Sequence, residues 1–364
     1  MKYMWSIVFG MLPFAGLAYA MWHIWLILPL GNVWKSLTIT LFVMAFFTMF
    51  LNFSKAIDHM PFSLASVVYE VGNTAIFVLL YLVMLFLALD LGRLCHIVPR
   101  QWLHSNLYSS LAIFIFMVAI FTYGNINYRN KVRQPLTLSS NGKLKRDIKI
   151  VLISDLHLGY HNRRSELRRW VDMINSEKPD LILIGGDIID ISLRPLIEDN
   201  DAEELKRFNA PVYACLGNHE YYCGDTLAER FYKEARINLL RDSIAVACGI
   251  NIIGRDDRSN PHRQNLAAIV KNSPLEGRFT ILLDHQPYHL EQAERQGIDF
   301  QFSGHTHHGQ VWPISWITEL IYEDAFGSLT KGHTQYYVSS GLGIWGGKFR
   351  IGTRSEYVVA TIRK

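Results

Sequence analysis

The sequence contains few cysteines and little net charge. Four cysteines occur among 364 residues, and no two of them form a CxxC pair. This argues against a structural zinc site or a disulfide framework and says little about the redox compartment. The formal net charge is only +4, without the extended basic surface that sequence-independent binding to nucleic acid requires. We therefore expect no nucleic-acid partner.

Charged residues are almost absent from the first third of the chain. Residues 1–123 carry five Lys or Arg and three Asp or Glu, whereas the rest carries thirty-one and twenty-nine. A membrane-spanning helix needs about 20 apolar residues, and a soluble helical bundle would need polar faces that are missing here. A cleaved signal peptide would explain only the first apolar stretch. We predict four spans, at Met4–Ala20 (or onward to Leu30), Trp34–Phe53, Thr74–Leu91 and Leu107–Gly124.

The basic residues around these spans predict their orientation. An even number of spans leaves both ends of the chain on one side of the membrane. Arg129, Lys131 and Arg133 directly follow the last span, and such clusters favour the cytoplasmic side. We therefore expect a multi-pass protein of the plasma (inner) membrane with its C-terminal domain in the cytoplasm.

Composition divides the chain into three parts. Residues 1–124 form the predicted transmembrane domain, residues 125–146 a polar, basic linker, and residues 147–364 a domain of another kind. In this last part, short β-branched runs such as IKIVLIS and LILIG alternate with amphipathic helical segments. That alternation predicts an α/β domain with a layered sheet.

Polar clusters follow five of the predicted strands: DLH, GDIID, GNHE, DHQP and GHTH. Since ligand sites of α/β sheets lie beyond the carboxyl ends of the strands, we expect these clusters to converge. They supply oxygen and nitrogen donors in a number that suits two ions, and imidazole with carboxylate favours Mn, Fe or Zn. Unrelated polar strand ends are the alternative, which five ordered clusters disfavour. The candidate ligands are Asp155, His157, Asp187, Asn218, His285, His305 and His307.

The spacing within two clusters predicts how their side chains point. If the strand tips are extended, residues i and i+2 face the same way. Asp155 with His157, and His305 with His307, would then each present a pair to the crevice.

The series DLH, GDIID, GNHE, a lone His and GHTH resembles the signature of the calcineurin-like metallophosphoesterase superfamily, DxH…GDxxD…GNH(D/E)…H…GHxH. The resemblance covers roughly Lys149–Arg363 and every signature position. The tail beginning GHTHHGQVWP is similar to a membrane-associated bacterial branch that usually reads GHTHGGQ, so His308 stands where glycine is usual. The resemblance implies a four-layer α/β/β/α domain that acts as a metal-dependent phosphoric ester hydrolase.

The resemblance also implies roles for individual residues. One metal would take Asp155, His157, Asp187 and His307, and the other would share Asp187 and take Asn218, His285 and His305.

Three further residues have implied or inferred roles near the metals. His219 would lie over the substrate as general acid, with Glu220 placed to orient it. We interpret Asp190 as a residue that holds a histidine or the backbone. Capping of the following turn is the alternative for Asp190.

The functional hypothesis is a membrane-anchored enzyme that hydrolyses a phosphodiester or pyrophosphate bond through a hydroxide bridging two metals. Because the spans confine it to the bilayer, we expect a lipid-linked or membrane-surface phosphate ester as substrate. One alternative is a phosphomonoesterase acting on a soluble or protein substrate. Another is a metal-stabilised scaffold serving the transmembrane domain, although the spans lack the buried charges of an ion path.

The stretch VWPISWITELIY, Val311–Tyr322, is unusually apolar for a loop beside a metal crevice. It predicts a lid that dips toward the bilayer or clasps an acyl chain, or else a segment packed on the sheet.

Overall fold

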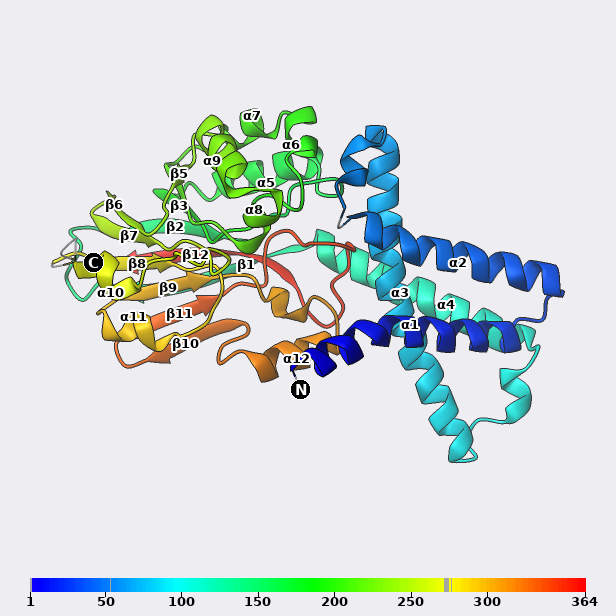
Figure 1. Ribbon diagram of the computed structural model, residues 1–364. Helices are drawn as coiled ribbons and strands as arrows, with labels where there is room; N and C mark the ends of the chain where they lie inside the picture. The colour runs from blue at the N-terminus through cyan, green and yellow to red at the C-terminus, as the bar shows by residue number, and fades with distance from the viewer. Residues whose placement is uncertain (1, 53, 272–274, 276) are drawn as a thin grey trace. The chain divides into compact units, whose positions relative to one another are not determined.

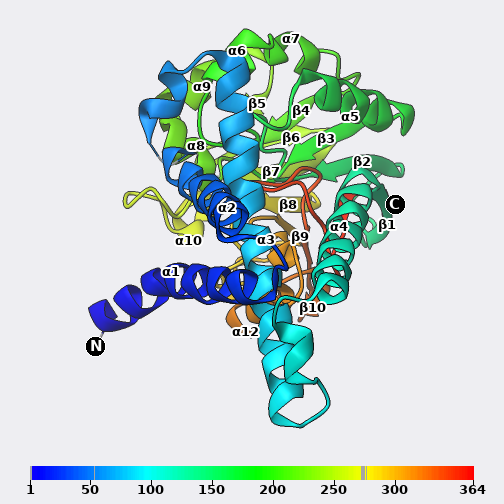
Figure 2. The same ribbon diagram turned by 90° about the vertical axis from the view of Figure 1, so that its right-hand side faces the viewer.

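A computed structural model describes residues 2–52, 54–271, 275 and 277–364. The chain divides into two compact units, Met1–Gly124 and Asn125–Lys364. Figure 1 and Figure 2 show helices alone in the first unit, and strands with shorter helices in the second.

Among its described residues, the N-terminal unit contains four helices long and apolar enough to cross a membrane. Their apolar residues surround the whole helix surface, which is typical of membrane spans and not of amphipathic surface helices. A Cβ added to Gly72 would lie 2.5 Å from the backbone nitrogen of Met49, so glycine allows α2 and α3 to approach closely. The helices are α1 (Lys2–Ile27), α2 (Asn32–Asn52), α3 (Phe62–Leu94) and α4 (Leu107–Arg129), with short 3₁₀ helices η1 (Lys55–His59) and η2 (Arg100–Leu103).

These helices confirm the prediction of four apolar N-terminal helices. α3 begins twelve residues before the predicted Thr74 and ends three residues after the predicted Leu91. Phe53, the predicted end of the second span, lies outside the described residues.

The C-terminal unit is built on two mixed sheets of six strands each. The first has the order β1 (Lys131–Ser139), β12 (Ser355–Arg363), β2 (Ile148–Ile153), β3 (Leu181–Ile184), β4 (Val212–Ala214) and β5 (Asn238–Leu239). The second has the order β10 (Gly327–Lys331), β11 (Thr334–Val338), β9 (Phe300–Ser303), β8 (Thr280–Leu283), β7 (Ile250–Gly254) and β6 (Ser243–Ala247). Strands β2–β5 run parallel, as do β7, β8, β9 and β11.

Helices cover the outer faces of the two sheets (Figure 1). They are α5 (Arg164–Ser176), α6 (Arg194–Glu198), α7 (Asp201–Leu205), α8 (Asn218–Cys223), α9 (Asp225–Glu234), α10 (Leu266–Lys271) and α11 (Glu291–Arg295). The unit also contains the 3₁₀ helix η3 (His307–Gly309) and α12 (Ile314–Ile321).

The core lies in three apolar layers. Val151 and Ile153 of β2 pack toward α5 and α9, whereas Ile150 and Leu152 pack between the sheets, as the two-residue period of a strand dictates. A third cluster, around Leu282, packs β8 against α10 and α11. The result is the predicted α/β/β/α order of layers, because each sheet buries both of its faces.

Residues 125–146, expected to be a linker, instead hold the end of α4 and the nine-residue strand β1. β1 pairs in parallel with β12, from Lys131 beside Ser355 to Ser139 beside Arg363. The polar composition concealed this strand because an edge strand needs apolar residues only at alternate positions, here Leu136 and Leu138. Pro135 is tolerated at such an edge.

Candidate metal centre

The seven predicted ligands lie in loops that follow the parallel strands of both sheets. Two follow β2, one follows β3, one begins α8 after β4, one follows β8 and two follow β9. Because these strand ends lie at one edge of the facing sheets, the structure brings all seven side chains together, and most of them are fully buried. The residues are Asp155, His157, Asp187, Asn218, His285, His305 and His307.

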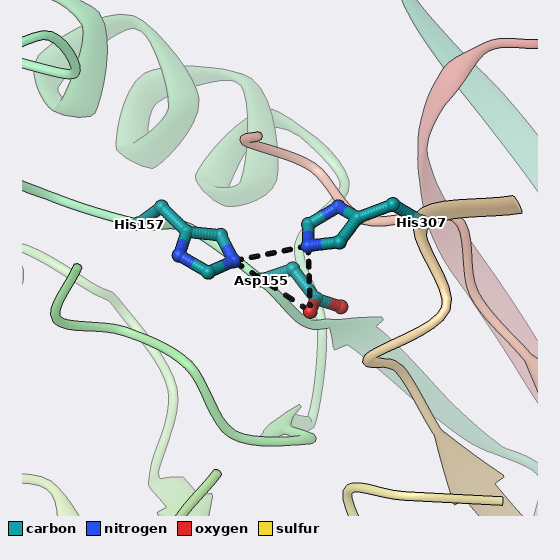
Figure 3. A group of neighbouring side chains, drawn as sticks. All are labelled: Asp155, His157 and His307. Atoms are coloured by element: carbon teal, nitrogen blue, oxygen red, sulfur yellow. Dashed lines mark hydrogen bonds and ion pairs between the residues drawn. The ribbon is translucent and has the colours of Figure 1, made fainter. Parts of the chain in front are cut away.

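The first group of donors consists of Asp155, His157 and His307 (Figure 3). The Nε2 atoms of the two histidines are 3.1 Å apart. Asp155 Oδ1 lies 3.4 Å from Nε2 of His307 and 3.8 Å from Nε2 of His157. Donor separations of this size are what one shared cation with bonds of about 2.0–2.2 Å imposes.

The second group consists of Asp187, Asn218, His285 and His305. His285 Nε2 lies 3.1 Å from Asp187 Oδ2 and 3.2 Å from Asn218 Oδ1, and His305 Nδ1 lies 2.8 Å from that same amide oxygen. Asp187 Oδ2 is also 3.6 Å from Nε2 of His157. The carboxylate of Asp187 therefore stands between the two groups.

Outer contacts fix which atom of each side chain faces the centre. The Nδ1 of His285 donates to the Gly185 carbonyl at 2.7 Å, which leaves the Nε2 lone pair for a ligand. The amide nitrogen of Asn218 donates to the Tyr222 hydroxyl at 3.2 Å, so its oxygen faces the histidines. Burial lowers the pKa of His305 to about 4. Despite its burial, hydrogen bonds to the Asp155 and Asp190 carboxylates raise the pKa of His157 to about 10, so a cation bound there would release a proton from His157. These residues fit divalent cations.

The backbone conformation of these loops differs from the extended conformation that we expected. Asp155, His157, Asp187, His305 and His307 all have positive φ, between 45° and 71°, so the tips are sharp left-handed turns and not extended segments. The pairing of residues i and i+2 by strand alternation was therefore wrong as an explanation. Asp and His accept this conformation more readily than bulky apolar residues, and such strain is typical of functional sites.

Two motif glycines are required by close packing around the carboxylates. A Cβ at Gly217 would lie 2.1 Å from Asp187 Oδ1, and one at Gly304 would lie 2.2 Å from Asp155 Oδ2. Any larger residue at either position would displace a candidate ligand.

His219 lies beside the first group and contacts Asp190. One donor atom of His219 lies within 4.8 Å of donor atoms of His157 and Asp187. The Nδ1 of His219 donates to the Asp190 carbonyl at 2.9 Å. Asp190 Oδ1 lies 3.3 Å from that nitrogen and 3.2 Å from Nδ1 of His157. One carboxylate thus contacts both imidazoles.

Glu220 occupies a different place from the predicted one. Its buried carboxylate accepts hydrogen bonds from the backbone N–H groups of Asp187, Ile189 and Gly217, at 3.1, 3.0 and 2.7 Å. Glu220 lies in the first turn of α8, and its side chain folds back over the helix start, as in a capping box. It orders the loop that carries Asp187, and the carboxylate beside the His219 ring is that of Asp190.

His308 adopts φ 49° and ψ 39°, a left-handed conformation that glycine reaches without steric cost. Its backbone N–H donates to Thr306 Oγ1 at 3.1 Å. The ring stacks on Phe326 with centroids 4.5 Å apart, and Nε2 lies 2.9 Å from Glu319 Oε1. These side-chain contacts hold the ring away from the metal ligands.

Arg350 was missed by the sequence analysis. Its fully buried guanidinium donates to the carbonyls of His307, at 2.5 Å, of Gly343, at 3.3 Å, and of Ser340. Burial lowers the pKa of Arg350 to about 10. Arg350 lies between Phe349 and Ile351 in the stretch KFRIGTR, and only the fold shows that it supports the His307 loop.

Fold and donors together define a metal-binding domain of two facing sheets with a helical layer on each side. The model of the calcineurin-like phosphoesterase family matches residues 148–309. The chain is 31% identical over 265 residues to an uncharacterized metallophosphoesterase of Campylobacter jejuni, covering 70% of this chain and 69% of the relative. The chain belongs to the calcineurin-like phosphoesterase family, which confirms the resemblance.

Other relatives extend this comparison. A Helicobacter pylori metallophosphoesterase is 33% identical over 230 residues, covering 59% of each chain. A Danio rerio transmembrane protein with a metallophosphoesterase domain is 33% identical over 229 residues, covering 57% of this chain and 52% of the relative. This chain thus spans between about half and two thirds of the length of these three relatives. The relatives and the four apolar helices indicate a membrane protein of a hydrolase family.

Proposed function

We propose that this chain is a membrane-anchored, two-metal phosphoesterase that hydrolyses a phosphodiester or pyrophosphate bond. Residues 1–124 would anchor the protein, and the catalytic domain would comprise residues 147–364 together with the added strand β1. The observation that carries the proposal is the position of Asp187, whose carboxylate lies 3.1 Å from His285 and 3.6 Å from His157. A bridging carboxylate between two donor groups is what a pair of cations requires.

In this proposal each donor group holds one cation. Asp155, His157 and His307 would hold one, Asn218, His285 and His305 the other, and Asp187 would serve both. Two bound divalent ions, of Mn, Fe or Zn, would supply an activated water and neutralise charge on the phosphoryl group.

His219 is the proposed general acid. Its Nδ1–H is held by the Asp190 carbonyl, so Nε2 is the atom available to give a proton to the leaving oxygen. The His219 side chain is 14% exposed, whereas the histidines of the first donor group are nearly or fully buried. His219 is therefore more accessible to a substrate than the histidines of the first donor group.

The proposed substrate is a phosphate ester linked to a lipid or held at the membrane surface. Four span-capable helices support this choice, because a bilayer-anchored domain meets bilayer-bound molecules at high local concentration. Arg129, Lys131 and Arg133 support a cytoplasmic location for the domain.

A hydrolysis screen with the purified full-length protein and Mn²⁺ tests the proposal. Substrates would be a soluble diester, bis(p-nitrophenyl) phosphate, the corresponding monoester, and a membrane lipid extract. We expect Asp187→Ala to lose at least about 100-fold in rate and His219→Ala about 10²–10⁴-fold. His262→Ala, at an exposed histidine, is the matched control and should retain activity.

Each outcome of the screen has a distinct meaning. Equal activity of wild type, Asp187→Ala and His219→Ala would overturn the catalytic assignment. Cleavage of soluble diesters without cleavage of any lipid would overturn the lipid-linked substrate. Preference for the monoester would favour the phosphomonoesterase alternative.

A further inference from the structure

Helix α12 carries a stripe of large apolar side chains that face outward. Trp316, Ile317, Leu320 and Ile321 lie on one side of the helix. Trp312 lies just before the helix, and its ring centroid is 5.4 Å from that of Trp316. Leu320 is 87% exposed and Trp316 is 58% exposed. We expected this stretch to form either a lid or a segment packed on the sheet. Because it is helical and its apolar side chains face outward, it is not packed on the sheet.

The opposite side of α12 is attached to the metal loops. Glu319 pairs with His308, the residue after the candidate ligand His307. At the end of the helix, the Tyr322 hydroxyl lies 3.1 Å from that of Tyr288, and the Tyr322 ring lies 6.3 Å from that of His305. The helix therefore forms a fixed border of the candidate metal centre.

The beginning of α12 adjoins the segment that receives the end of the last span-capable helix. Asn127, in the last turns of α4 and part of the C-terminal unit, donates to the carbonyls of Arg350 and Thr353 at 2.9 and 2.8 Å. Trp312 donates its backbone N–H to the carbonyl of Ile351, between those two residues, at 2.7 Å. The apolar stripe thus starts close to the last turns of α4, within the C-terminal unit.

We propose that α12 lies in the bilayer interface, with its apolar stripe toward the acyl chains and its two tryptophans near the headgroups. Tryptophan favours this depth because its ring is apolar and its N–H is polar. Residues 311–322 contain one acidic residue and no Lys or Arg, so apolar burial drives the contact and anionic lipid is not needed. If the proposed function also holds, the metal centre opens onto the lipid surface.

Site-specific labelling of the full-length protein in lipid nanodiscs tests this contact without relying on activity. The exposed Cys95 and Cys248 are first replaced by serine, and Leu320→Cys is labelled with the environment-sensitive fluorophore NBD. Ile197→Cys is the matched control, since Ile197 is an apolar residue of the same unit, on α6, with 69% exposure. The protein with both serine substitutions and no introduced cysteine measures how much label reacts with the remaining cysteines.

We expect blue-shifted emission at Leu320, with quenching by nitroxide-labelled phosphatidylcholine roughly twofold or more above the Ile197 control. The result should be the same in nanodiscs with and without anionic lipid. Emission and quenching equal to the control would overturn the proposal, because the stripe would then face water. A blue shift without lipid quenching would also overturn it, since another protein surface would then cover the stripe. Trp316→Cys repeats the measurement one turn away.

Discussion

The carboxylate of Glu220 accepts a 3.1 Å hydrogen bond from the backbone N–H of Asp187, the residue whose own carboxylate joins the two donor groups. With its bonds to Ile189 and Gly217, Glu220 replaces the water that these N–H groups would otherwise need. The left-handed turn at Asp187 is thus held in place from behind by one buried side chain.

The variant Glu220→Gln tests this role. The glutamine side chain has only one oxygen that can accept hydrogen bonds, and its NH₂ group would face backbone N–H donors. We therefore expect the unfolding free energy to fall by about 1–3 kcal/mol. Bound divalent metal should fall with it, as measured by elemental analysis of the purified protein. Glu203→Gln, at an exposed glutamate, should change neither. Normal stability and metal content in Glu220→Gln would contradict the role.

Asp190 is expected to position both His157 and His219. Asp190→Ala removes the oxygen that contacts each Nδ1 atom, and we expect metal affinity to fall about 10–100-fold, as for other residues that orient ligands. Because the His219 ring also loses a contact, the pH dependence of kcat should shift in the same variant. An unchanged affinity together with an unchanged pH profile would show that Asp190 serves only to cap the turn.

His308 tests the cost of the left-handed turn beside the metal ligands. His308→Gly removes the backbone strain but loses the contacts to Glu319 and Phe326, so we expect it to fold with normal metal content. His308→Val keeps the strain in a β-branched residue, and we expect it to be less stable than the glycine variant by about 1–2 kcal/mol. Thermal unfolding of the two variants checks the order. Equal stability would mean that the turn relaxes.

Asp201 predicts a pH-dependent stability that is separate from the metal centre. Burial and the nearby Asp199 raise the pKa of Asp201 to about 7, above the value of about 3.9 in an unfolded chain. Between these values the folded state binds more protons, so this residue makes stability fall as pH rises. At pH 8 we expect Asp201→Asn to be more stable than wild type by at least about 1.4 kcal/mol, one pKa unit.

Unfolding curves of wild type and Asp201→Asn at pH 8 and near pH 4 measure this effect. The gain should shrink toward pH 4, where Asp201 is protonated in the folded state and about half protonated in the unfolded chain. A gain of the same size at both pH values would contradict the assignment.

The elements that the sequence predicted well are those with strong local patterns. The apolar helices and the buried strands before DLH, GDIID and GHTH are recognisable from composition alone, and the glycines of the motifs indicate tight turns. The edge strand β1 was missed because half of its residues face solvent. The contacts of Arg350 and Glu220 could not be predicted, because both side chains bind backbone groups of residues elsewhere in the chain. Every residue type carries such groups, so the sequence does not indicate which of them a side chain will contact.

The order of strands in the first sheet has a consequence for how the protein matures. β12, the last strand of the printed sequence, lies between β1 and β2, and Arg350 just before it supports the carbonyl of His307. While the ribosome is still making these residues, β1 has no partner and the His307 loop lacks its support. Strand β1 and the His307 loop therefore reach their final contacts only after residues 350–363 have been synthesised.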